Sequence, residues 1–122
     1  MNRPFVLDSS AVVALFDANP RVMTIWRWAN LGENVVAIPA TVLVHASQVA
    51  DIAPSAWEAI LYPLTVMPLD SASALGVLES PERLDIAHTA WEADLMRATV
   101  VTRHPASYRL RKLPVLSLRP DQ

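Results

Sequence analysis

The sequence predicts an α/β protein: a parallel sheet of about five strands covered by helices on both faces, in three layers. Short apolar runs recur along the chain and alternate with segments of helical character. The runs are apolar throughout rather than alternating with polar residues, as expected of strands buried on both faces. The chain has 122 residues, of which 52% are hydrophobic and 18% charged. We therefore expect a single domain, residues 1–122, around one compact core.

The strands follow from the apolar runs, and the helices follow from the segments between them. Strands are predicted at residues 5–7, 35–38, 64–67, 100–102 and 115–118. Helices are predicted at about residues 9–18, 20–31, 40–49, 55–61, 71–78 and 85–97. Each strand is thus separated from the next by a helix or a long connection, which parallel pairing requires.

Capping and turn residues mark the helix boundaries. Ser9 or Ser10 suits the N-cap of the first helix, and Asp70 suits that of the helix at residues 71–78. Pro20 favours the first turn of the second helix, and Gly32 ends it. That helix has apolar residues spaced i, i+3, i+4 and i+7, at Val22, Ile25, Trp26 and Ala29.

Composition excludes several classes of protein. With no cysteine, the chain has neither disulfides nor a thiolate metal site. With only two glycines and no Gly-rich phosphate loop, a nucleotide-binding α/β domain of the Rossmann or Walker type is disfavoured. No apolar run of 18 residues and no secretory leader is visible, so we expect no membrane contact and a cytoplasmic location.

The net charge of −2 conceals a cationic C-terminal part. Six of the ten basic residues lie there with no acid between them, at Arg97, Arg103, Arg109, Arg111, Lys112 and Arg119. Such a stretch is either a solvated surface or a contact for phosphate groups, and the sequence leaves both interpretations open.

Three of the predicted strands end at segments that are candidates for a site. Asp8 ends the first strand, Pro39 the second, and residues 102–104 follow the fourth. Ligands of parallel sheets bind beyond the carboxyl ends of the strands, so we expect these segments and the start of the long helix, near Asp85, to share one cleft.

Five segments carry a resemblance to a known family. In order and spacing, VLDSSAVVALF, IPATVLVHASQVA, LDIAHTAWEA, VVTRHPASY and LPVLSL resemble the PIN domain of small VapC-like toxins, over nearly the whole chain. The resemblance implies a compact α/β/α fold, metal-dependent ribonuclease chemistry at four acidic positions, and an antitoxin partner bound near residues 22–57. It also implies a homodimer through the first and the long helix.

Two of the four acidic positions are histidine in this chain. The resemblance implies that Asp8 and Asp85 are the catalytic acids, that His45 stands at the family's glutamate, and that His104 stands at its last aspartate. Further residues would support the acids or contact RNA: Ser9, Ser10, Thr102, Arg103, Arg109 and Arg111.

Two functional hypotheses follow. In one, Asp8, Asp85, His45 and His104 hold a divalent metal, Mg²⁺ or, because imidazole suits softer ions, Mn²⁺ or Zn²⁺, and the protein cleaves RNA. In the other there is no cofactor, catalysis is lost, and the fold binds a partner protein or RNA.

Each candidate also has a purely structural interpretation. Asp8 could cap the first helix, and Asp85 stands where a helix N-cap is favoured. His88 lies one turn beyond Asp85, and we expect it to pack or to form hydrogen bonds rather than to bind a metal. Trp28 is expected at the surface, as part of a protein interface.

Overall fold

The computed structural model describes residues 3–119. Its centre is one parallel sheet in the order β3-β2-β1-β4-β5. The strands are β1 (Phe5–Leu7), β2 (Val36–Pro39), β3 (Thr65–Met67), β4 (Thr99–Thr102) and β5 (Val115–Ser117). The predicted fold class is confirmed, and every predicted strand is present with its ends within one residue.

Six α-helices and one short 3₁₀-helix connect the strands. They are α1 (Ser9–Phe16), α2 (Pro20–Asn30), α3 (Ala40–Ala50), α4 (Pro54–Leu61), α5 (Ser71–Val77), α6 (Leu84–Met96) and η1 (Pro105–Tyr108). The α-helices were predicted, whereas η1 was not. None of the helices within residues 3–119 is long and apolar enough to cross a membrane.

One predicted helix cap is confirmed and another is wrong. Asp70 caps α5 through a reciprocal pair of hydrogen bonds with Ser73, as predicted in position. The prediction of Ser9 or Ser10 as the N-cap of α1 was wrong. Asp8 takes that place, because its carboxylate accepts the backbone N–H of Ala11.

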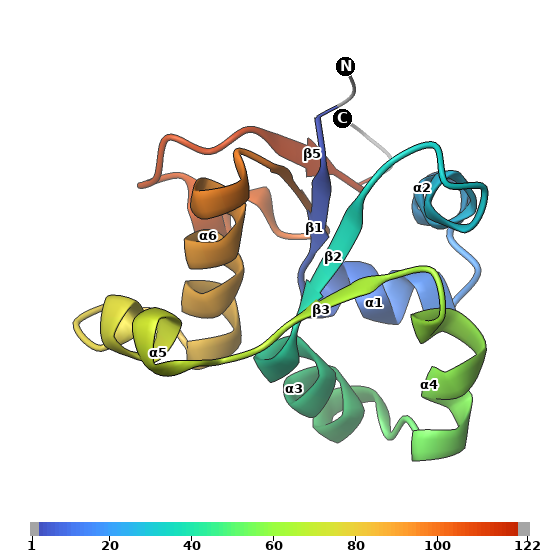
Figure 1. The fold of residues 1–122 in the computed structure, drawn as a ribbon, viewed down its shortest axis with the longest axis horizontal. Coiled ribbons are helices and arrows are strands. Elements are labelled where there is room, and N and C mark those ends of the chain that lie inside the picture. The colour runs from blue at the N-terminus through green and yellow to red at the C-terminus, as the bar shows by residue number, and fades with distance from the viewer. Residues whose placement is uncertain (1–2, 120–122) are drawn as a thin grey trace.

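The helices form layers on both faces of the sheet (Figure 1). Residues of α1 to α4 pack on one face, and α6 packs on the other, with α5 against the outer side of α6. Val6 belongs to the core beneath α6, while its neighbour Leu7 belongs to the core beneath α1. Both side chains are fully buried, which explains why the strands are apolar throughout. Each such burial stabilises the fold by about 1.5–3 kcal/mol.

The contact of α5 with α6 depends on a glycine. The ring of Trp91 lies directly over Gly76, and a Cβ atom there would overlap it. We expect Gly76→Ala to lower the free energy of unfolding by about 1–3 kcal/mol, measured by chemical denaturation. In a Trp91→Ala background the same change should instead stabilise by about 0.5–1 kcal/mol, because alanine is the better helix former. An equal cost in both backgrounds would contradict the contact.

Candidate functional site

A pocket opens where the carboxyl ends of the central strands meet α1, α3 and the start of α6. Its volume is about 340 Å³. Six polar residues line it: Ser9, Ser10, His45, Arg83, Arg103 and His104. Asp8 and Asp85 lie buried beside this lining, with exposed fractions of 5% and 3%. The structure thus brings the four family positions to one place, although only the two histidines reach the pocket surface.

Asp8 is held by three donors from α1 and η1. Its Oδ1 accepts hydrogen bonds from the Ser10 hydroxyl at 2.7 Å and from the backbone N–H of Ala11 at 2.9 Å. Its Oδ2 accepts the Tyr108 hydroxyl at 2.9 Å. Asp8 therefore caps α1, which was the structural role that the sequence suggested for it, and also connects the end of β1 to η1. Burial, reinforced by the Asp8 charge, raises the pKa of Tyr108, so this phenol stays a donor.

Asp85 is held by an arginine from the loop just before it. Arg83 donates to Oδ1 through Nε at 2.5 Å and to Oδ2 through Nη2 at 3.1 Å. The Ser9 hydroxyl donates to Oδ2 at 2.7 Å. Burial disfavours the charged form of Asp85, but the Arg83 and Ser9 hydrogen bonds outweigh it, and the pKa of Asp85 lies below its ordinary value. Asp85 is therefore an ionised carboxylate in a two-pronged ion pair.

A chain of hydroxyls joins β4 to α1. The backbone N–H of Arg103 donates to Ser10 Oγ at 2.8 Å, and that of His104 donates to Thr102 Oγ1 at 2.9 Å. The two hydroxyls lie 3.2 Å apart. Since the single Ser10 proton is directed at Asp8, Thr102 is the donor to Ser10. Ser10 and Thr102 thus fix the segment that carries Arg103 and His104 at the pocket.

The hydrogen bonds at the two acids disfavour a divalent metal in the arrangement that the structure shows. Every carboxylate oxygen of Asp8 and Asp85 accepts at least one hydrogen bond from the protein. A hard cation needs such oxygens as ligands, and here the Arg83 charge already lies against one carboxylate. Within residues 3–119, no three His, Cys, Asp or Glu side chains are grouped so that they could bind a metal.

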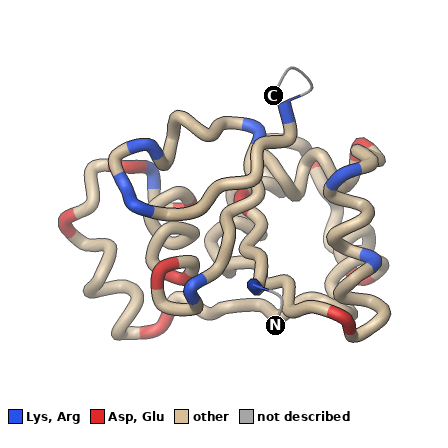
Figure 2. Tube along the Cα trace, turned by 90° about the horizontal axis from the view of Figure 1, so that it is seen from above, with Lys and Arg blue, Asp and Glu red and all other residues tan. Residues whose placement is uncertain are grey.

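Two predicted RNA-contacting arginines lie outside this pocket. Arg111 pairs with Glu82 at 2.8 Å and lines a separate hollow with Trp91. The Arg111 hydrogen bonds lower the pKa of Glu82 to about 2. Arg109 is exposed on the same cationic segment. Figure 2 shows several basic positions gathered on the loop before the C-terminal strand, with an acidic position beside them.

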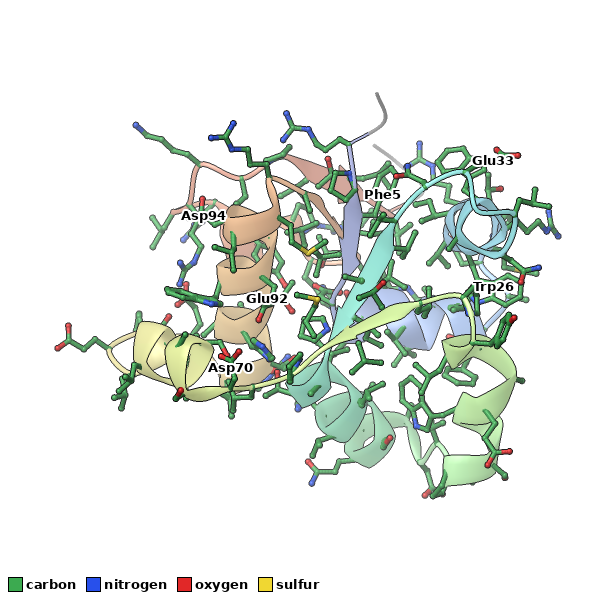
Figure 3. The ribbon with its side chains drawn as sticks, in the orientation of Figure 1. Phe5, Trp26, Glu33, Asp70, Glu92 and Asp94 are labelled. Carbon is green, nitrogen blue, oxygen red and sulfur yellow. The ribbon has the colours of Figure 1, made fainter. Side chains whose placement is uncertain are left out.

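His88 has the structural role that we expected. It is fully buried, with Nδ1 2.8 Å from the Thr41 hydroxyl and Nε2 3.0 Å from Glu92. Glu92 points from α6 toward the sheet, whereas Asp94 points away from it (Figure 3). This hydrogen-bonded group joins α3 to α6 behind the pocket.

Sequence analysis missed Arg83 and Tyr108. Arg83 lies two residues before Asp85, so an i, i+2 charge pair at a helix start was the available signal. Tyr108 lies 100 residues after Asp8, and nothing in the sequence indicates their contact.

The Glu82–Arg111 pair predicts an acid-dependent stability difference. Because the pKa of Glu82 falls from 4.5 to about 2 on folding, the pair stabilises the protein fully above pH 4.5 and ceases to do so toward pH 2. Arg111→Gln should cost about 1 kcal/mol at pH 7, since both side chains are partly exposed. In thermal denaturation, the difference in stability between Arg111→Gln and the wild type should disappear between pH 4.5 and pH 2. The matched change Arg109→Gln should show no such pH dependence. A stability difference that does not change with pH would contradict the Glu82–Arg111 ion pair.

Comparison with known proteins identifies solved structures that have a similar fold. No family model and no curated protein matches the chain. A chain of the VapBC2 structure from Rickettsia felis, solved with a DNA fragment from its promoter, is similar with a TM-score of 0.71 at 16% identity, over 93% of this chain and 97% of that one. PAE2754 from Pyrobaculum aerophilum is similar with a TM-score of 0.63 at 15% identity, over 93% of this chain and 83% of that one. At these identities the likeness shows the fold, and the chain has the PIN-like, VapC-like fold that its sequence resemblance predicted.

Proposed function

We propose that this protein is the PIN-like component of a toxin–antitoxin pair, and that it binds RNA and an antitoxin without metal-dependent cleavage at Asp8 and Asp85. The likeness to a VapBC2 chain over nearly the full length of both supports the toxin–antitoxin part. One observation supports the loss of metal chemistry: the Arg83 guanidinium already neutralises Asp85, and each of the two remaining acids accepts three hydrogen bonds from the protein.

The chemistry of phosphodiester hydrolysis explains why this observation matters. A divalent ion lowers the pKa of a bound water and neutralises the phosphate, and it needs carboxylate lone pairs to stay bound. To reach Asp85, the ion would have to displace the Arg83 guanidinium and two charge-assisted hydrogen bonds. At the other two positions it would meet His45 and His104, which bring no negative charge.

Exposed apolar residues support an antitoxin partner. Five of them lie on α2, on α3 or in the segment between these helices: Trp28, Leu31, Val35, Val44 and Val49. They fall within the segment that the resemblance implies for antitoxin binding. Aromatic and aliphatic side chains of this kind form the core of protein interfaces. The homodimer through α1 and α6 stays a prediction.

A metal-dependent ribonuclease is the second candidate. His45 and His104 line the same pocket, beside both acids, which is the arrangement that a mixed nitrogen and oxygen site would need. The Arg83 side chain is 55% exposed, so it has room to leave Asp85.

Cleavage assays separate the two candidates. We expect the purified protein to leave single-stranded RNA intact in Mg²⁺, Mn²⁺ and Zn²⁺, because the acids are engaged. Asp8→Asn is the control for the metal, since asparagine caps a helix about as well as aspartate and should keep the fold. Cleavage that appears with one of these ions and is lost in Asp8→Asn would establish the ribonuclease instead.

A charge-restoring series tests the part played by Arg83. We expect His45→Glu with His104→Asp to bind Mg²⁺ weakly by calorimetry, because Arg83 still occupies Asp85. Adding Arg83→Gln should strengthen binding by about tenfold or more. Arg27→Gln on α2, whose residues do not line the pocket, is the matched third change and should add nothing. If the double variant already binds as tightly as the triple, Arg83 does not block the site.

A further inference from the structure

We infer that the pocket is a phosphate-binding site that works without metal, with Arg83 in the position where a cation would neutralise Asp85. The lining contains two arginines, two histidines and two serines, and no acid. The acids lie beneath it and are spent on internal hydrogen bonds. That the ligand is RNA rests on the proposed function, whereas binding of a phosphate group in the pocket does not.

Arg83 is held ready for an anion. Its Nε and Nη2 donate to Asp85, which fixes the plane of the guanidinium and leaves Nη1 for a ligand. The side chain is 55% exposed and lines the pocket, so the ligand can reach it. A guanidinium fixed in this way loses little side-chain entropy when it binds a phosphate, which favours arginine over lysine here.

Arg103 supplies a second cationic group. Its backbone is fixed by the hydrogen bond to Ser10, and its side chain lines the pocket. Its ion pair with Asp17 is long, at 3.5 Å, and Asp17 is 61% exposed. Exposed pairs of this kind are weak, so a phosphate can replace Asp17 at little cost.

The two histidines complete the ring of donors around the pocket. His45 comes from α3 and His104 from the segment after β4, so donors come from several separate elements of the chain. Each imidazole can donate a hydrogen bond to a phosphate oxygen. The charges facing them are those of Arg83, Arg103 and the buried Asp8 and Asp85.

The ligand class is a phosphate monoester or diester. The cavity of about 340 Å³ exceeds what a phosphate alone requires, and Val13, Ala46 and Val49 give it an apolar wall. That combination suits a phosphate attached to a sugar. The source is either the RNA backbone or a free nucleotide, and the two are distinguished by measurement.

Binding measured in a chelator is the test. We expect a labelled single-stranded RNA to bind equally well with EDTA and with Mg²⁺, and inorganic phosphate or a nucleoside monophosphate to compete. Arg83→Gln should weaken RNA binding about tenfold and reduce the salt dependence by about one phosphate contact. Arg83→Lys should recover part of the affinity, which shows that charge rather than folding is involved. Arg27→Gln should have no effect.

A gain of affinity gives a readout that misfolding cannot produce. Asp17→Asn removes the competitor of Arg103, so we expect RNA and phosphate binding to become at least about twofold tighter, an energy within the range of an exposed ion pair. Glu58→Gln, on exposed α4, is the matched neutral change.

Each outcome decides between the proposals. If RNA binding requires Mg²⁺, or if its affinity is the same in the Arg83 and Asp17 variants as in the wild type, the inferred phosphate site is wrong. The proposed RNA-binding function would still hold. Binding of the monophosphate or inorganic phosphate through Arg83, without RNA binding, supports the site and removes RNA from the proposed function. Binding of none of the three ligands overturns the inference.

Discussion

The ion pair between Arg83 and Asp85 determines what this pocket can do. A buried carboxylate loses the hydration that stabilises its charge, so it must be paired or protonated. In a metal site the ion is that partner. Here a guanidinium from two residues upstream takes its place, and Ser9 supplies the remaining hydrogen bond. The protein therefore carries its own counter-charge at Asp85. Because this partner is covalently part of the chain, its local concentration is high, and a free ion competes with it at a disadvantage.

The buried carboxylate of Asp8 is stabilised without a cation. Its donors are two hydroxyls and a backbone N–H, and it sits at the N-terminus of α1, where the helix dipole favours a negative charge. The contact with Tyr108 also fixes η1 against β1. Asp8 is thus part of the structure, whatever else it does, and removing its charge without replacing its cap would disturb three elements at once.

The sequence predicted the sheet well because the central strands β1, β2 and β4 are largely buried and therefore mostly apolar, while the edge strands β3 and β5, although more exposed, are still short apolar runs. It also predicted that segments after β1, β2 and β4 meet, since the carboxyl ends of parallel strands share one edge. It did not predict the partners of the two acids. For the start of α1 the sequence offered Ser9, Ser10 and Asp8 as caps, and the structure shows that Asp8 accepts the backbone N–H of Ala11. The Tyr108 contact spans 100 residues and follows from packing alone.

The two histidines and Arg83 form one consistent charge balance. Four acids in one pocket would leave three negative charges after a single arginine had paired, and their repulsion would raise the pKa of some of these carboxyls unless a cation were bound. With His45 and His104 in place of two acids, Arg83 neutralises Asp85, and only Asp8 is left, where helix and hydroxyl dipoles stabilise it. A cation then finds only Asp8 without a cationic partner, and that carboxylate already accepts three hydrogen bonds. An anion finds one guanidinium held in place, a second that is weakly paired, and two imidazoles on the pocket wall. Under the proposed function, histidine rather than an acid at residues 45 and 104 therefore favours an anion over a cation in this pocket.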